Sequence, residues 1–189
     1  MIPHLRFDDV ACDRGGRRLF EGIGFELQPG EAMRLTGPNG AGKSSMLLVA
    51  AGLLVPSEGT VVSRELALAD DRLALDRSLP LGRALSFWAR LDGREEALNE
   101  AMEDLGLAPL SDVPVAFLST GQKRRAGLAR LVASGASLWL LDEPADGLDF
   151  ETRGRLDTLI TRHRARGGAV LAASHQSLDG EWRSMELGR

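Results

Sequence analysis

A run of glycines that ends in one lysine and two hydroxyls, "GPNGAGKSS", has the residue types needed to hold phosphate. It matches G-x-x-x-x-G-K-[ST], in which glycines let backbone N–H groups turn toward phosphate oxygens at the start of a helix. We predict that Lys43 reaches the β- and γ-phosphates and that the Ser44 hydroxyl ligates Mg²⁺. A flexible glycine-rich turn is the alternative, but the expected strand before and helix after favour a phosphate site. The residues predicted to bind nucleotide here are Gly37, Pro38, Asn39, Gly40, Ala41, Gly42, Lys43, Ser44 and Ser45.

Two acidic residues and one histidine follow apolar runs further along the chain. Asp142 and Glu143 come directly after "LWLL", and His175 comes directly after "AVLAAS". Open α/β sheets bind ligands at the carboxyl ends of their strands, where these residues are expected. Asp142 suits an outer Mg²⁺ ligand, Glu143 could polarise a water for attack on the γ-phosphate, and His175 could contact that phosphate. The alternatives are a solvated acidic strand end and a structural histidine.

A second anion site is predicted at "LSTGQ", which leads into a helix. Ser119 and Gly121 lie where a helix N-terminus offers unpaired N–H donors. One nucleotide could not easily touch this site and the glycine loop if the two lie in different lobes of one chain. A dimer in which each "LSTGQ" faces the loop of the other chain is the economical solution.

The elements that must position these residues alternate between strands and helices. Apolar strands between amphipathic helices indicate a parallel sheet covered on both sides, with the central helices inserted into that α/β core. Strands are expected at 4–12, 23–28, 32–37, 59–63, 66–70, 137–144 and 168–174, and helices at 43–54, 81–91, 94–107, 121–134 and 151–167.

The composition is that of a globular protein and narrows the choice of partners. The net charge of -4 over 189 residues does not favour binding to nucleic acid. The longest apolar run, 46–55, is far short of the roughly 20 residues that span a bilayer. The single Cys12 cannot form an intrachain disulfide, which fits a reducing compartment. His4 and His163 are expected to be solvated, and Trp139 to pack in the core.

Taken in order, "GPNGAGKS", "LSTGQ", "LWLLDEP", "DGLD" and "SH" resemble the nucleotide-binding domain of an ABC ATPase. The resemblance covers essentially the whole chain. It implies an α/β fold with a P-loop NTPase core of ABC ATPase type, a mostly parallel sheet, a trimmed antiparallel β-subdomain and an inserted helical subdomain. Residues 1–76 and 134–189 would form the core and 77–133 the helical subdomain.

The resemblance also implies roles for individual residues. Two ATP molecules with Mg²⁺ would lie between two chains arranged head to tail, with Glu143 as catalytic base and His175 as the γ-phosphate switch. Ser119, Gly121 and Gln122 would contact the nucleotide of the partner chain. Asp149 would lie in the loop that crosses the dimer interface.

Three departures from the family pattern leave questions open. Arg14 stands where the family usually places an aromatic residue on adenine; its guanidinium could stack there, or it could be a solvated turn residue. Asp71 stands about where a glutamine usually couples Mg²⁺ to the helical lobe; it could ligate Mg²⁺ or lie in a surface turn. The segment 59–66 is shorter than is common, so the accessory sheet is expected to be reduced.

The stretches "CDRGGRRLFEGIGFELQPGE", "LSFWARLDG", "ASLWLLDEP" and "SHQSL" are similar to the ATP-binding subunits of haem exporters for cytochrome c maturation. That resemblance implies membrane permease subunits of CcmB-like and CcmC-like type, a periplasmic haem chaperone, and a peripheral place at the cytoplasmic face of the bacterial inner membrane. ATP hydrolysis would then drive haem export or the release of haem-loaded chaperone. The alternatives are the ATPase subunit of an unrelated exporter and a soluble regulatory ABC protein. A single cassette without basic stretches or heptads counts against the regulatory protein.

Overall fold

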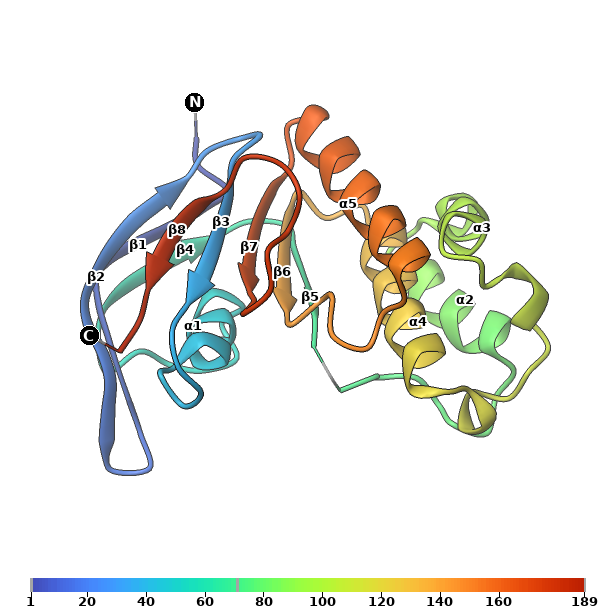
Figure 1. Ribbon diagram of the computed structural model, residues 1–189, viewed down its shortest axis with the longest axis horizontal. Coiled ribbons are helices and arrows are strands. Elements are labelled where there is room, and N and C mark those ends of the chain that lie inside the picture. Colours follow the sequence, from blue (N-terminus) through green and yellow to red (C-terminus); the bar gives the residue numbers. More distant parts are fainter. Residues whose placement is uncertain (1, 71, 189) are drawn as a thin grey trace.

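The computed structural model describes residues 2–70 and 72–188. Helices and strands alternate along most of the chain, and three helices follow one another in its central part (Figure 1). The elements are β1 (Leu5–Arg14), β2 (Arg17–Leu27), β3 (Ala32–Thr36), α1 (Lys43–Ala50), β4 (Glu58–Ser63), β5 (Leu66–Ala69), α2 (Leu81–Leu91), α3 (Glu95–Asp104), η1 (Ala108–Leu110), η2 (Val115–Phe117), α4 (Thr120–Ala133), β6 (Leu138–Asp142), α5 (Phe150–Ala165), β7 (Ala169–Ala173) and β8 (Arg183–Glu186).

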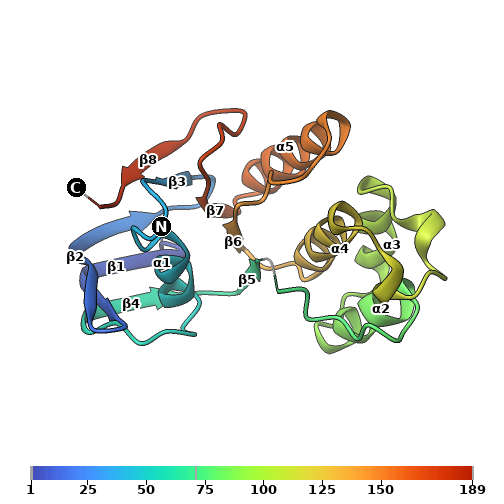
Figure 2. The same cartoon turned by 60° about the horizontal axis from the view of Figure 1, so that its bottom comes forward.

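Two sheets organise the described residues. The larger has the strand order β5-β6-β7-β3-β8 and pairs its strands in parallel, whereas the smaller has the order β2-β1-β4 and is antiparallel. Figures 1 and 2 show α1 and the smaller sheet on one side of the larger sheet and α2–α5 on the other. The predicted parallel sheet with a small antiparallel sheet and inserted helices is confirmed.

Strand β6 shows how the central sheet separates two hydrophobic cores. Its side chains alternate between the two faces, as they must in an extended strand. Leu138 and Leu140 face the core formed with α1 and the antiparallel sheet, whereas Trp139 and Leu141 face the helices. Every one of these side chains is at least nine-tenths buried. The continuous apolar run therefore reflects burial on both faces.

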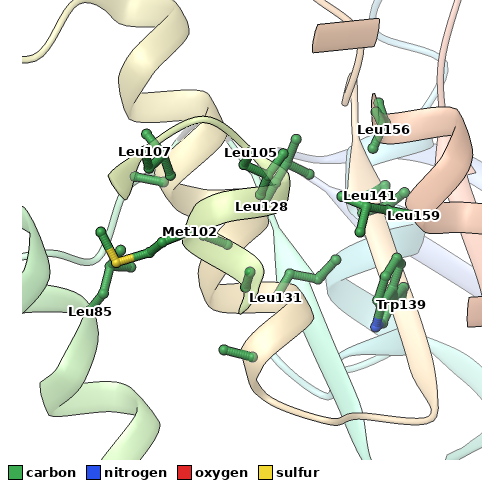
Figure 3. Packing of buried hydrophobic residues seen from close by; sticks show 14 of the residues in the cluster. Leu85, Met102, Leu105, Leu107, Leu128, Leu131, Trp139, Leu141, Leu156 and Leu159 are labelled. Atoms are coloured by element: carbon green, nitrogen blue, oxygen red, sulfur yellow. The ribbon is translucent and has the colours of Figure 1, made fainter. Parts of the chain in front are cut away.

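The inserted helices share the second core with α5. Figure 3 shows Leu85, Met102 and Leu128, from three different helices, in one cluster with Trp139 of β6 and Leu156 of α5. The inserted helices and the sheet therefore share one continuous core. The predicted boundaries of the helical subdomain, at 76/77 and 133/134, stay a prediction. Among the described residues, none of the helices combines the length and the apolar character needed to span a membrane.

One strand was missed and two histidines were misjudged from the sequence. Strand β8 was not expected, because "RSME" lacks an apolar alternation; it is a mostly exposed edge strand that pairs with β3. His163 is half-buried and not freely solvated, because its ring stacks on the Trp139 indole, with centroids 3.9 Å apart and planes at 7°. Burial lowers the pKa of His163 to about 4. His4 is also half-buried, and its Nε2 lies 2.9 Å from the Gly167 carbonyl oxygen.

Candidate functional site

The glycine loop connects β3 to α1, as predicted, and its backbone depends on glycine. Gly37, Gly40 and Gly42 all have positive φ, at 130°, 81° and 101°. At Gly37 a Cβ would overlap the carbonyl oxygen of Leu187, so the loop passes directly against the end of β8. Only glycine takes these conformations without strain or steric conflict.

The start of α1 provides donors for an anion. Its N-cap residue is Gly42, which has no side chain with which to cap the helix. The first N–H groups of a helix have no partner within it, so those at Lys43 and Ser44 are suited to a phosphate. Lys43 is buried, and its Nζ donates to the carbonyl oxygens of Gly37 at 2.8 Å and Pro38 at 3.2 Å. The lysine ammonium therefore lies inside the loop that it is predicted to serve.

Arg14 is exposed and lies beside this loop. Its Nη1 donates to the Ser45 Oγ at 3.2 Å. A cavity of about 440 Å³ is lined by Arg14, Leu19, Asn39, Gly40, Gly42, Lys43, Ser44, Ser45 and Glu143. Arg14 is thus one of the residues that line the cavity, and its stacking on adenine stays a prediction.

The acidic pair and the histidine meet at the carboxyl ends of β6 and β7. Asp142 is the last residue of β6, and the backbone N–H of Glu143 donates to the carbonyl oxygen of Ala173 at 2.8 Å. Glu143 has a φ of 45°, a conformation uncommon for a residue with a side chain. The Oε2 of Glu143 lies 2.9 Å from His175 Nδ1 and accepts from the His175 backbone N–H at 3.2 Å. The structure thus places two of the predicted residues in direct contact.

Asp142 and Ser44 border a second cavity beside the first. Its volume is about 330 Å³, and it is lined by Arg14, Ser44, Leu47, Leu48, Leu68, Asp70, Arg72, Arg124, Asp142, Glu143 and Asp146. A hydroxyl and a carboxylate are ligand types that Mg²⁺ accepts. Asp71, the third predicted metal ligand, lies outside the described residues.

Asp146 and Gln176 join this group although sequence reasoning did not single them out. The Asp146 Oδ1 lies 3.6 Å from His175 Nε2 and accepts from Gln176 Nε2 at 3.0 Å. Both residues were within quoted motifs, Asp146 opening "DGLD" and Gln176 following "SH". Their adjacency depends on how two loops meet, which the sequence does not reveal.

The "LSTGQ" segment begins α4 with reciprocal hydrogen bonds. The Ser119 Oγ accepts from the Gln122 backbone N–H at 3.2 Å, and the Gln122 Oε1 accepts from the Ser119 N–H at 2.8 Å. Figures 1 and 2 both show α4 beyond β5 and β6 from α1. Ser119, Gly121 and Gln122 do not line the cavity at the glycine loop. Within one chain, the structure does not bring the two predicted anion sites together.

Asp149 ends the loop between β6 and α5 and caps that helix. Its Oδ1 accepts from the Thr152 backbone N–H at 2.8 Å. This hydrogen bond holds the pKa of Asp149 below its usual range. The same loop lies close to α4: a Cβ on Gly121 would be 3.5 Å from the Gly147 carbonyl oxygen. Whether Asp149 reaches a second chain stays a prediction.

Comparisons with known proteins give one consistent result. The family model described as "ABC transporter" matches residues 20–146. The cytochrome c biogenesis ATP-binding export protein CcmA of Sphingopyxis alaskensis is 54% identical over 180 residues, which cover 94% of this chain and 93% of that protein. The protein of the same name from Rhodopseudomonas palustris is 41% identical over 190 residues, covering 95% of each chain.

Solved structures show the same fold at low sequence identity. A putative ATP-binding protein of an ABC transporter from Pyrococcus furiosus superposes with a TM-score of 0.84 at 21% identity, covering 97% of this chain and 96% of that chain. An ATP-binding subunit of an ABC transporter gives a TM-score of 0.82 at 23% identity, covering 90% of this chain and 79% of that one. The predicted fold class is confirmed.

Proposed function

Because the chain belongs to the ABC transporter family, and within it to the cytochrome c biogenesis ATP-binding export proteins, we propose that it is the ATP-hydrolysing subunit of an ABC complex that exports haem for cytochrome c maturation. The proposal that the chain hydrolyses ATP rests on one observation: three features meet at the carboxyl end of the larger sheet. The lysine loop, the Asp142-Glu143 pair and His175 follow β3, β6 and β7. The loop and the acidic pair border adjoining cavities, and His175 contacts Glu143 at 2.9 Å.

The glycine loop is proposed to hold the phosphates of ATP. Positive-φ glycines let the backbone approach the ligand closely, and the uncapped start of α1 supplies N–H donors and a favourable dipole. Lys43 would exchange its bonds to Gly37 and Pro38 for bonds to phosphate oxygens. The buried ammonium is thereby held ready at the place where negative charge arrives.

The Ser44 hydroxyl and the Asp142 carboxylate are proposed to hold Mg²⁺, because both border the same cavity. When bound, Mg²⁺ would neutralise charge on the β- and γ-phosphate oxygens. Glu143 would orient a water for attack on the γ-phosphate and take its proton. His175 contacts the Glu143 carboxylate at 2.9 Å and would orient that base. It would also contact the γ-phosphate and so respond to its presence or loss.

A head-to-tail homodimer is proposed to complete each site. The separation of α4 from the glycine loop supports this arrangement, since the Ser119 end of α4 needs a nucleotide held by another chain. Membrane permease subunits of CcmB-like and CcmC-like type would anchor the dimer at the cytoplasmic face of the inner membrane. Haem, or haem-loaded chaperone, is the proposed cargo.

The hydrolytic role is tested with Glu143→Gln in the complex assembled with its membrane subunits. Removing a positioned base is expected to lower the ATPase rate by about two to four powers of ten while ATP still binds. Glu181→Gln, at an exposed position after β7, is the matched control and should keep the wild-type rate. Wild-type hydrolysis by Glu143→Gln would refute the assignment of Glu143.

The cargo and partners are tested by co-purification from native membranes. The proposal expects cytochrome-maturation membrane proteins to travel with the chain, and its deletion to abolish maturation of c-type cytochromes. Recovery with an unrelated permease, with normal cytochrome maturation on deletion, would favour an unrelated exporter and leave the ATPase role intact.

A further inference from the structure

His175 lies between two carboxylates, and only one of them belongs to the predicted catalytic set. Its Nδ1 is 2.9 Å from Glu143 Oε2, and its Nε2 is 3.6 Å from Asp146 Oδ1. Both contacts fall within ion-pair distance, and the one to Glu143 is the closer by 0.7 Å. The ring is therefore held on one side by the base and faces a charge on the other.

Two hydrogen bonds to neighbouring residues hold Asp146 in place. Its backbone N–H donates to the Glu143 carbonyl oxygen at 3.1 Å, and its Oδ1 accepts from Gln176 Nε2 at 3.0 Å. Gln176 in turn accepts at Oε1 from Arg153 of α5 at 3.1 Å. The Asp146 carboxylate is thus anchored to the loop that follows β7, which also carries His175.

A third element reaches Asp146 from the inserted helices. Arg124 of α4 donates from Nη1 to the Asp146 backbone carbonyl oxygen. Arg124 lies in the second turn of α4, the helix that Ser119 caps. A displacement of α4 would therefore act on the backbone of the residue that faces His175.

We propose that Asp146 is a positioning residue for hydrolysis. It keeps the His175 ring oriented toward Glu143, and through Arg124 it connects these two residues to α4. The inference rests on the proposed ATP hydrolysis. It gives a role to Asp146, a residue of the "DGLD" motif for which the sequence predicted none. Asp146 also borders the cavity shared by Ser44 and Asp142. A direct role as a metal ligand is therefore the competing explanation that the experiment must separate.

The test measures single-turnover ATP hydrolysis, the KM for ATP and the Mg²⁺ requirement in the assembled complex. Asp146→Asn keeps the size of the side chain and removes its charge. Gln176→Glu keeps an acceptor for Arg153 but sets a second carboxylate against Asp146, so it should displace Asp146 without changing that residue. Each is also made in a His175→Ala background, and Asp112→Asn, at an exposed position in the inserted region, is the matched control.

Asp146→Asn is expected to lower the hydrolysis rate about tenfold, with KM and the Mg²⁺ requirement within about twofold of wild type. Gln176→Glu should act in the same direction, and Asp112→Asn should behave as wild type. Neither change should slow hydrolysis further once His175 is alanine, because residues that act through one another are not additive.

Three results for Asp146→Asn would overturn the inference: a wild-type hydrolysis rate, an equal loss of rate with and without His175, and a raised Mg²⁺ requirement. The ATPase proposal would still stand if Glu143→Gln is inactive. Thermal unfolding identifies a folding defect in Asp146→Asn, in which case Gln176→Glu decides by the same criteria. Full activity of Glu143→Gln would overturn the catalytic assignment and this inference together.

Discussion

Replacing Gly37 with alanine tests whether close packing of the glycine loop against the end of β8 contributes to stability. Gly37 has a φ of 130°, and a Cβ there would overlap the Leu187 carbonyl oxygen and lie 3.2 Å from its carbonyl carbon. Since a backbone carbonyl cannot rotate away as a side chain can, either the loop or β8 must shift. We expect a loss of roughly 3–5 kcal/mol in the free energy of unfolding, from backbone strain and the displaced strand together.

Gly40→Ala is the matched control, because the two glycines belong to the same loop. Its φ is 81°, but a Cβ there meets no other atom of the described chain within 4 Å. Only the strain of a positive φ remains, about 1 kcal/mol. At roughly 2–4 °C for each kcal/mol, Tm without nucleotide should fall by about 6–20 °C in Gly37→Ala and by about 2–4 °C in Gly40→Ala. Equal shifts in the two variants would refute the idea that contact with Leu187 decides the cost.

Two further predictions concern stability. The pKa of His163 is about 4 in the folded chain and 6.5 without the fold. The unfolded chain therefore binds the proton more tightly, and the free energy of unfolding should fall as pH drops from 6.5 toward 4, by about 1–2 kcal/mol after allowance for solvent screening. His163→Phe, which keeps a ring against Trp139, should lose less over that range in urea unfolding, and an equal loss would contradict the assignment to His163. Ser119→Ala removes the side-chain acceptor of the α4 capping box and should cost about 1 kcal/mol, seen as a Tm shift of roughly 3 °C; an unchanged Tm would show that the cap does not stabilise α4.

Most of the fold could be predicted because local patterns and burial agree. Strand β6 is apolar on both faces because each face packs in a hydrophobic core. Helix α4 begins where Ser119 and Gln122 can form a capping box. Strand β8 could not be predicted, since an exposed edge strand held mainly by backbone pairing with β3 needs no apolar pattern. His163 was misjudged for a related reason, because its stacking partner Trp139 is distant in the sequence.

The candidate site divides in the same way. The glycine loop and the Asp142-Glu143 pair have local signatures, so their residues and approximate places followed from the sequence. The contact between Glu143 and His175, and the approach of Asp146 to both, depend on loops from two neighbouring strands. Contacts of that kind arise from tertiary packing, and a single sequence does not encode them in any local pattern.

The pairing of β8 with β3 also has a consequence for the order of folding. Strand β3 is synthesised before its neighbour β8, which follows roughly 150 residues later. Until then β3 has an uncovered edge, and the glycine loop lacks the carbonyl against which Gly37 rests. Pairing across such a long separation is slow, because loop closure precedes any gain. The nascent chain would therefore acquire a finished nucleotide pocket only after β8 has emerged, and a chain without β8 would bind ATP weakly.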